Sequence, residues 1–365
     1  MEAARRREPF GVGARLEARL RALVLLALVL DVPVFRAVTT SLTGAPRVET
    51  VELAGVPAEI ARPAGKGPWP AWVFVSGAHP LRRREPIVRR LVDGLARAGY
   101  LVVQPDPSGL GEGRVTCDTL DATVAAARAA ADLPDVRDGR VALLGASMGA
   151  GLVLLVAARP DFADRVSVVA AVAPFADIEK LVCLGTTGQY EEDGRFVRYP
   201  VTSLHRCVVA RSLAGALRAG SERDRLLAEL GPELDEPDLT GLAGRVGRVG
   251  EETQTVVRLL ANPDPLRFRE LYDALPGEMR VGLRALSPLA SCGGLQAPVE
   301  LVVPPSDQYF PLGEAAALAR ALPTGRLTVS GALDHTRPQL SLDRLEELRR
   351  FDAFVVRSLA RARWG

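Results

Sequence analysis

Residues 140–151 read Arg140-Val-Ala-Leu-Leu-Gly-Ala-Ser-Met-Gly-Ala-Gly151. Residues 141–144 are apolar and lie between Gly139 and Gly145, as expected for a short strand that is covered on both faces. From Met148 onward the apolar residues recur at helical spacing, and Pro160 ends the run. The stretch therefore predicts a buried strand, a tight turn and a helix.

The turn itself fits G-x-S-x-G, the pattern of a nucleophile elbow, with Ser147 between Gly145 and Gly149. The glycines have a steric reason, because side chains two positions either side of the serine would collide with the adjoining strand or helix. The turn would expose the Ser147 hydroxyl and leave the amide of Met148 at a helix N-terminus, free to donate to an oxyanion. A phosphate-binding loop is the alternative, but it would require a lysine after the glycines.

Composition narrows the class of protein. The chain has 365 residues, which is enough to bury a full hydrophobic core. Its net charge of +2 gives no indication of nucleic-acid binding. Four cysteines without C-x-x-C spacing argue against a metal site, although Cys183 and Cys207 could pair in an exported protein. Only three histidines occur, so a histidine-dependent mechanism has few candidates.

Residues 1–45 form an N-terminal arm with three open interpretations. Three consecutive arginines, residues 5–7, precede an apolar run at residues 22–30, which is too short to span a bilayer because about 20 apolar residues are needed. The run could be the core of a signal peptide, an amphipathic anchor that binds a membrane surface through residues 16–35, or a helix packed on the enzyme. We expect a cytoplasmic or membrane-associated protein, with secretion less favoured.

From residue 46 the chain alternates strands and helices, which predicts a mainly parallel sheet of about eight strands. The first two strands are expected as a hairpin around Ala54-Gly55, and Asp118 is expected to cap a helix over residues 119–131. The alternation stops at residues 176–285, which contain amphipathic helical runs and no convincing strand. We therefore expect a catalytic domain over residues 46–175 and 286–365, with residues 176–285 inserted as a helical cap.

A nucleophilic serine needs a base and a carboxylate that orients the base. His335 follows the last predicted strand and Asp307 follows the strand before it, so both should lie at the sheet edge that carries Ser147. Asp177 is the alternative acid, although capping of the first insertion helix is its favoured role. His205, inside the insertion, is expected to be structural, and Asp334 is expected to point away from its neighbour His335.

The loop after the predicted strand at residues 69–75 should supply a second oxyanion donor. We expect this donor to be the backbone amide of Ala78, paired with that of Met148. His79 is a candidate for contact with the substrate, and a purely structural role is equally open.

These residues resemble the α/β-hydrolase superfamily over residues 48–175 and 286–365. The resemblance is carried by Gly145-Ala-Ser-Met-Gly149, Ser76-Gly77-Ala78, Gly99-Tyr-Leu-Val-Val-Gln-Pro-Asp106, Ser306-Asp307 with Pro311, and Asp334-His335. In this family the nucleophile, acid and base follow in that order, which implies Ser147, Asp307 and His335. Two departures concern loops: Ser76-Gly77 stands where members commonly have His-Gly, and Pro304-Pro305 begins the acid loop where Gly is frequent.

The resulting hypothesis is a capped serine hydrolase that cleaves a carboxylic ester of a small-molecule substrate through an acyl-enzyme, without cofactor or metal. Amides, peptides and thioesters remain open as substrates, as does acyl transfer to an alcohol. The alternative that is not an enzyme is a non-catalytic ligand-binding protein of the same fold. The oligomeric state is not predicted.

Overall fold

A sheet of eight strands forms the centre of the molecule, in the order β1-β2-β4-β3-β5-β6-β9-β10. The computed structural model describes residues 11–78, 81–231, 237–338 and 345–365. β1 and β2 form an antiparallel hairpin and β2 pairs antiparallel with β4, whereas the remaining pairs are parallel. The predicted mainly parallel sheet is confirmed. The strands are β1 Arg47–Leu53, β2 Val56–Arg62, β3 Trp69–Val75, β4 Leu101–Pro105, β5 Val136–Ala146, β6 Val166–Val172, β9 Val299–Val303 and β10 Gly325–Val329.

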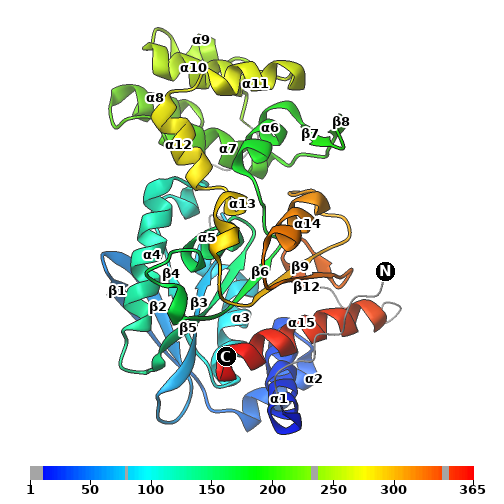
Figure 1. The fold of residues 1–365 in the computed structure, drawn as a ribbon. Helices are drawn as coiled ribbons and strands as arrows, with labels where there is room; N and C mark the ends of the chain where they lie inside the picture. The colour runs from blue at the N-terminus through cyan, green and yellow to red at the C-terminus, as the bar shows by residue number, and fades with distance from the viewer. Residues whose placement is uncertain (1–10, 79–80, 232–236, 339–344) are drawn as a thin grey trace.

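Helices cover both faces of this sheet (Figure 1). Neighbouring residues of a strand point to opposite faces, so Leu143 packs with α4 and α5, while Leu144 packs with α3 and α15. Because both of their faces are buried, the central strands β3, β4, β6 and β9 are mostly apolar, which is why their positions could be predicted from sequence. The flanking helices are α3 Pro86–Arg97, α4 Cys117–Ala131, α5 Met148–Ala157, α14 Leu312–Ala321 and α15 Leu345–Trp364.

Between β6 and β9 the chain forms a group of helices that Figure 1 shows beyond one end of the sheet. These insertion helices are α6 Ile178–Thr187, α7 Ser203–Gly215, α8 Ser221–Glu229, α9 Leu242–Val246, α10 Glu251–Leu260, α11 Pro265–Asp273 and α12 Gly277–Ala285, and α13 Pro288–Ser291 leads back to the sheet. Short elements complete the described chain: single 3-10 turns at Arg82–Arg84, Leu110–Glu112, Ala163–Arg165 and Cys292–Gly294, and a pair of two-residue strands, β11 Leu333–Asp334 and β12 Arg337–Pro338.

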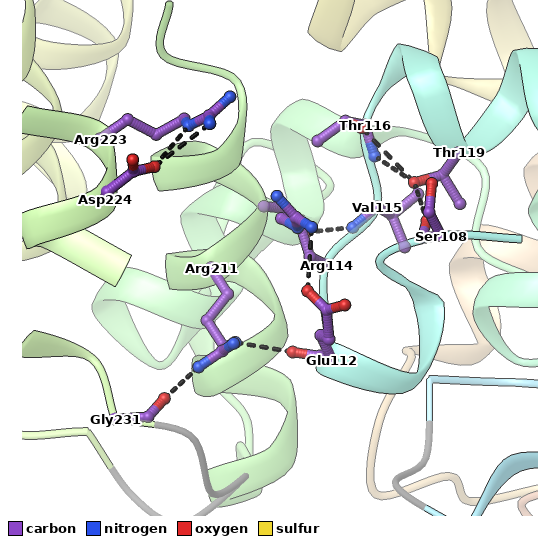
Figure 2. Close-up of polar contacts among 11 residues, drawn as sticks. Ser108, Glu112, Arg114, Val115, Thr116, Thr119, Arg211, Arg223, Asp224 and Gly231 are labelled. Carbon is purple, nitrogen blue, oxygen red and sulfur yellow. Dashed lines mark hydrogen bonds and ion pairs between the residues drawn. The ribbon is translucent and has the colours of Figure 1, made fainter. Parts of the chain in front are cut away.

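Helix α7 is attached to the loop that precedes α4, as Figure 2 shows. The buried guanidinium of Arg211 donates from Nε to the carbonyl of Glu112 at 2.6 Å and from Nη1 to the carbonyl of Gly231. At the next residue of α7, the hydroxyl of Ser212 accepts the backbone N–H of Val115 at 2.9 Å. Buried backbone groups are costly to leave unpaired, so these bonds fix α7 over the sheet.

Two helices precede the sheet, α1 Val12–Val29 and α2 Pro33–Leu42. Helix α1 begins well before the apolar run at residues 22–30 and packs against α3 and α15. This packing agrees with the interpretation of the arm as a helix that packs on the enzyme. Nowhere in the described ranges does a helix combine the length and apolar character needed to cross a bilayer.

Two local predictions were wrong. The insertion does contain strands, because β7 Gln189–Glu192 and β8 Arg195–Arg198 form an antiparallel hairpin. Helix α4 starts two residues earlier than expected and is capped by Thr116, whose side chain and that of Thr119 form a reciprocal capping box, so Asp118 lies inside the first turn.

Candidate active site

Ser147 lies between the end of β5 and the start of α5 in a backbone conformation that is rare for a residue with a side chain, φ 54° and ψ −123°. Its N–H donates to the carbonyl of Val172 at 2.9 Å, which holds the turn against β6. A Cβ at Gly149 would collide with the carbonyl oxygens of Val75 and Ser76 at the end of β3, and one at Gly145 would collide with the start of α5. The two glycines therefore allow the strand and helix to approach closely enough to form the turn.

Asp307 and His335 are brought together from two loops. Asp307 follows β9, and His335 follows β10 at the end of β11. The Nδ1 of His335 donates to the Asp307 carboxylate, 2.8 Å from Oδ2 and 3.0 Å from Oδ1. The carboxylate also accepts the N–H of Tyr309 at 2.7 Å, so Asp307 both orients the imidazole and closes the turn of its own loop.

Ser147 and His335 line one outer pocket of about 280 Å³, together with Gly77, Ala78 and Asp334. The side chains of Ser147 and His335 therefore border the same cavity. Met148 is the first residue of α5, so its N–H is one of those that have no partner within the helix. Ala78 is buried and borders the same pocket as Ser147, and both amides remain predicted oxyanion donors.

Ser147 also lines a second, apolar pocket of about 40 Å³. Most of its other lining residues belong to the insertion, among them Leu181 of α6 and Val208 and Val209 of α7. Among the described residues that line it, none is acidic or basic apart from His205. Ala78, Ser147, Leu204 and Tyr309 border both pockets, so the serine hydroxyl is at their junction.

The acid loop is attached to the insertion through two side chains. The hydroxyl of Tyr199, after β8, donates to the carbonyl of Asp307. His205 of α7 lies between the carbonyls of Tyr309 and Leu181, at 3.0 and 3.2 Å. Burial lowers the pKa of His205 to about 4, so the ring is neutral near pH 7 and donates to one of the two carbonyls at a time. His205 is a buried structural residue, as expected.

The other acidic candidates have different roles. Asp177 caps α6, where Oδ1 accepts the N–H of Glu179 at 2.9 Å, which agrees with the capping role favoured from sequence. Asp334 is exposed at the rim of the outer pocket. His79, predicted to be able to contact substrate, lies outside the described residues. Cys183 is a buried thiol whose pKa burial raises to about 11.

Sequence reasoning missed Tyr309, although it stands in the loop that supplied Asp307. Its ring lies against that of His335, with centroids 4.2 Å apart, and borders both pockets. An aromatic residue two positions after the acid was the available signal. Within the parts of the chain that the structure describes, no group of three or more His, Cys, Asp or Glu side chains could hold a metal ion.

Comparisons with known proteins agree with this architecture. A family model described as X-Pro dipeptidyl-peptidase (S15 family) matches residues 54–231. No curated protein matches the chain by sequence. Among solved structures, dipeptidyl peptidase 4 from Porphyromonas gingivalis matches 89% of this chain with a TM-score of 0.50 and 15% identity, and the chain spans 37% of that protein's length.

Two further solved structures are similar over most of their own length. A 2,6-dihydroxy-pseudo-oxynicotine hydrolase matches 95% of this chain and 80% of its own with a TM-score of 0.49 and 15% identity. A meta-cleavage product hydrolase from Pseudomonas fluorescens matches 87% of this chain and 97% of its own with a TM-score of 0.44 and 18% identity. With the strand order and the strand-turn-helix at Ser147 taken together, the chain has the α/β-hydrolase fold.

Proposed function

We propose that the protein is a serine hydrolase that cleaves a carboxylic ester, with Ser147 as nucleophile, His335 as general base and Asp307 as the residue that orients the base. The observation that carries the proposal is the bond from His335 Nδ1 to Asp307, because it leaves the other ring nitrogen for a pocket that Ser147 also lines. The match to a peptidase family supports a serine hydrolase but leaves the ester open.

The proposed reaction has two steps. In the first, His335 takes the proton of the Ser147 hydroxyl as the oxygen attacks the ester carbonyl, and the amides of Met148 and Ala78 stabilise the resulting oxyanion. The tetrahedral intermediate then expels the alcohol, which receives the proton from His335. In the second, His335 deprotonates a water molecule that attacks the acyl-enzyme, and the acid is released as Ser147 regains its proton.

We propose that the insertion acts as a cap and that its apolar pocket holds the acyl group. The pocket of about 40 Å³ is small and lined by apolar side chains, which favours a short acyl chain. The outer pocket is larger and carries the charged groups Glu85, Asp334 and Arg337, which favours it as the site of the leaving alcohol and of the attacking water.

Labelling with a fluorophosphonate tests the nucleophile. Wild-type protein should label, whereas Ser147→Ala and His335→Ala should label at background. Labelling that persists in Ser147→Ala would refute the assignment of the nucleophile. A series of p-nitrophenyl esters tests the substrate: activity should be highest for acetate to butyrate and fall for longer chains, and a maximum at long chains would refute the short acyl pocket.

A peptide bond is the second candidate, because residues 54–231 match a family described as X-Pro dipeptidyl-peptidase. A dipeptidyl-peptidase must recognise a free amino terminus, for which a carboxylate facing the substrate is the natural partner. Ala-Pro-p-nitroanilide distinguishes the candidates. Release of nitroaniline with a kcat/KM above that for p-nitrophenyl acetate would favour the peptidase, and the absence of release would favour the esterase.

A further inference from the structure

Helix α1 is apolar on two opposite sides. One side is buried against α3 and α15. The other carries Val12, Leu16, Leu20 and Leu23, which recur at spacings of three or four residues and therefore share one face. These four side chains are between 57% and 86% exposed. A helix that is apolar on both sides is expected to be covered on both, yet the described structure covers only one.

Helix α2 continues the exposed apolar surface. Val34, Phe35, Val38 and Leu42 lie on one face and are between 51% and 80% exposed, and the helix has no buried residue. The two helices are in contact with each other. We call these eight side chains the N-terminal apolar surface. Exposed apolar surfaces mark sites that bind a partner or a membrane.

Helix α2 is nevertheless held in place. Arg97 of α3 donates from Nη1 to the carbonyl of Thr43 at 3.0 Å and to its hydroxyl at 3.2 Å. At the other end, Arg36 and Arg90 both pair with Asp31, at 2.9 and 2.6 Å. The apolar side chains are therefore presented by a helix that is fixed to the body of the enzyme.

Two hydroxyls of α2 and the hydroxyl of its C-cap residue are satisfied by carbonyls of the helix. The hydroxyls of Thr40, Ser41 and Thr43 donate to main-chain carbonyls three or four residues earlier, at 2.7 to 3.0 Å. Such groups do not need water as a hydrogen-bond partner, so the helix can enter a water-poor environment at low cost.

The charges of the two helices are asymmetric. Their exposed charged residues are all basic, namely Arg15, Arg19 and Arg36. The two acidic residues are half-buried and paired, Glu17 with Arg21 and Asp31 with Arg36. Residues 11–43 contain four arginines against Glu17 and Asp31, so the N-terminal apolar surface is accompanied by a net charge of +2, which complements an anionic surface.

We propose that the N-terminal apolar surface binds the headgroup and outer acyl region of an anionic phospholipid membrane, with α1 and α2 as a peripheral anchor. A second copy of the chain fits less well, because a symmetric contact would place the exposed arginines of one copy beside those of the other. Figure 1 shows α1 and α2 at the end of the molecule away from α8–α11, so the anchored enzyme would keep its insertion clear of the membrane.

Vesicle binding by the full chain tests the proposal. Wild-type protein should co-sediment with vesicles of phosphatidylcholine and phosphatidylglycerol, and binding to phosphatidylcholine alone should be weaker by about tenfold. Leu16→Glu with Leu20→Glu, and independently Phe35→Glu with Val38→Glu, should each lower the partition coefficient by about tenfold or more. Two separate pairs are used so that misfolding of one does not remove the test.

Leu266→Glu with Val281→Glu is the matched control, because these side chains on α11 and α12 are also exposed and apolar, at 79% and 70%. The control should bind as wild type does. The proposal is overturned if wild-type protein stays in the supernatant, or if the control loses binding as much as the α1 and α2 pairs. It is also overturned if the protein is a dimer that ignores vesicles and becomes monomeric in Phe35→Glu with Val38→Glu.

Discussion

The ring of Tyr309 lies against the imidazole of His335, with the two centroids 4.2 Å apart and the planes inclined by 39°. The backbone N–H of the same residue donates to Asp307, which in turn accepts the bond from His335. One residue thus contacts the proposed base through its side chain and the proposed acid through its main chain. The acid loop therefore orients the imidazole by two separate contacts.

Replacing the Tyr309 ring should separate these contacts. Tyr309→Ala keeps the backbone bond to Asp307 but removes the surface against His335, so kcat/KM for p-nitrophenyl acetate should fall by about three- to tenfold, the value of one aromatic contact. Tyr309→Phe keeps the ring and should retain activity within about twofold. Steady-state kinetics check both. If the phenylalanine variant lost as much as the alanine variant, the hydroxyl and not the ring would be responsible.

Asparagine and alanine at position 307 should have different effects. Asp307→Asn keeps an oxygen that can accept the N–H of Tyr309, so thermal stability should change little, while the loss of the charge beside His335 should lower kcat by about 10⁴-fold. Asp307→Ala also removes the acceptor for the loop and should lower the melting temperature as well. Calorimetry and kinetics on both variants separate the roles. Wild-type activity in Asp307→Asn would exclude this residue as the acid.

Replacing Ser147 with glycine should stabilise the fold. Its φ of 54° and ψ of −123° is a conformation in which a Cβ is strained, at a cost of about 1–3 kcal/mol. Ser147→Gly should raise the free energy of unfolding by a comparable amount, less about 1 kcal/mol for the flexibility that glycine adds to the unfolded chain. Urea unfolding measures the difference. A clear loss of stability would show that the turn is not strained.

Gly149 and Gly313 offer a matched pair, because each is the second residue of a helix. Gly149→Ala would bring a methyl group against the carbonyls of Val75 and Ser76, which are backbone atoms and cannot move aside, so a loss of at least about 3 kcal/mol is expected. Nothing lies within 4 Å of a Cβ at Gly313, and Gly313→Ala should be neutral or stabilising by up to about 1 kcal/mol. Equal stability of the two variants would refute the close approach at the elbow.

Much of the sheet could be predicted from the sequence because its strands are buried on both faces. β3 Trp69–Val75 was predicted with the bounds that the structure gives, and β9 Val299–Val303 was predicted as the strand that precedes Asp307. Their apolar runs end at glycine, proline or polar loops, which gives the boundaries a physical signal. The loops after these strands contain Ala78 and Asp307, and for this reason the candidate site could be proposed before the fold was known.

The insertion was harder to predict because its short elements lack that signal. β7 and β8 are mostly exposed and polar, so no apolar alternation marks them, yet Asp193-Gly194 between them is a typical hairpin turn and both residues have positive φ. The turn signal was present in the sequence and was not used. The bond from Tyr199 to the carbonyl of Asp307 joins segments 108 residues apart, and no local pattern predicts such a contact.

His205 should make stability depend on pH. Burial lowers the pKa of His205 in the folded protein from 6.5 to about 4, so the unfolded chain binds the proton more readily. The contribution of His205 to the free energy of unfolding is therefore complete above pH 6.5 and is lost as the pH falls toward 4. When the pH is lowered from about 7.5 to about 5, this histidine should lower the free energy of unfolding by about 2 kcal/mol. His205→Gln removes the titrating group and keeps a donor for the carbonyl of Tyr309 or Leu181, so urea unfolding at the two pH values should show a correspondingly smaller difference. An unchanged pH dependence in His205→Gln would mean that the ring is not held neutral between α6 and the acid loop.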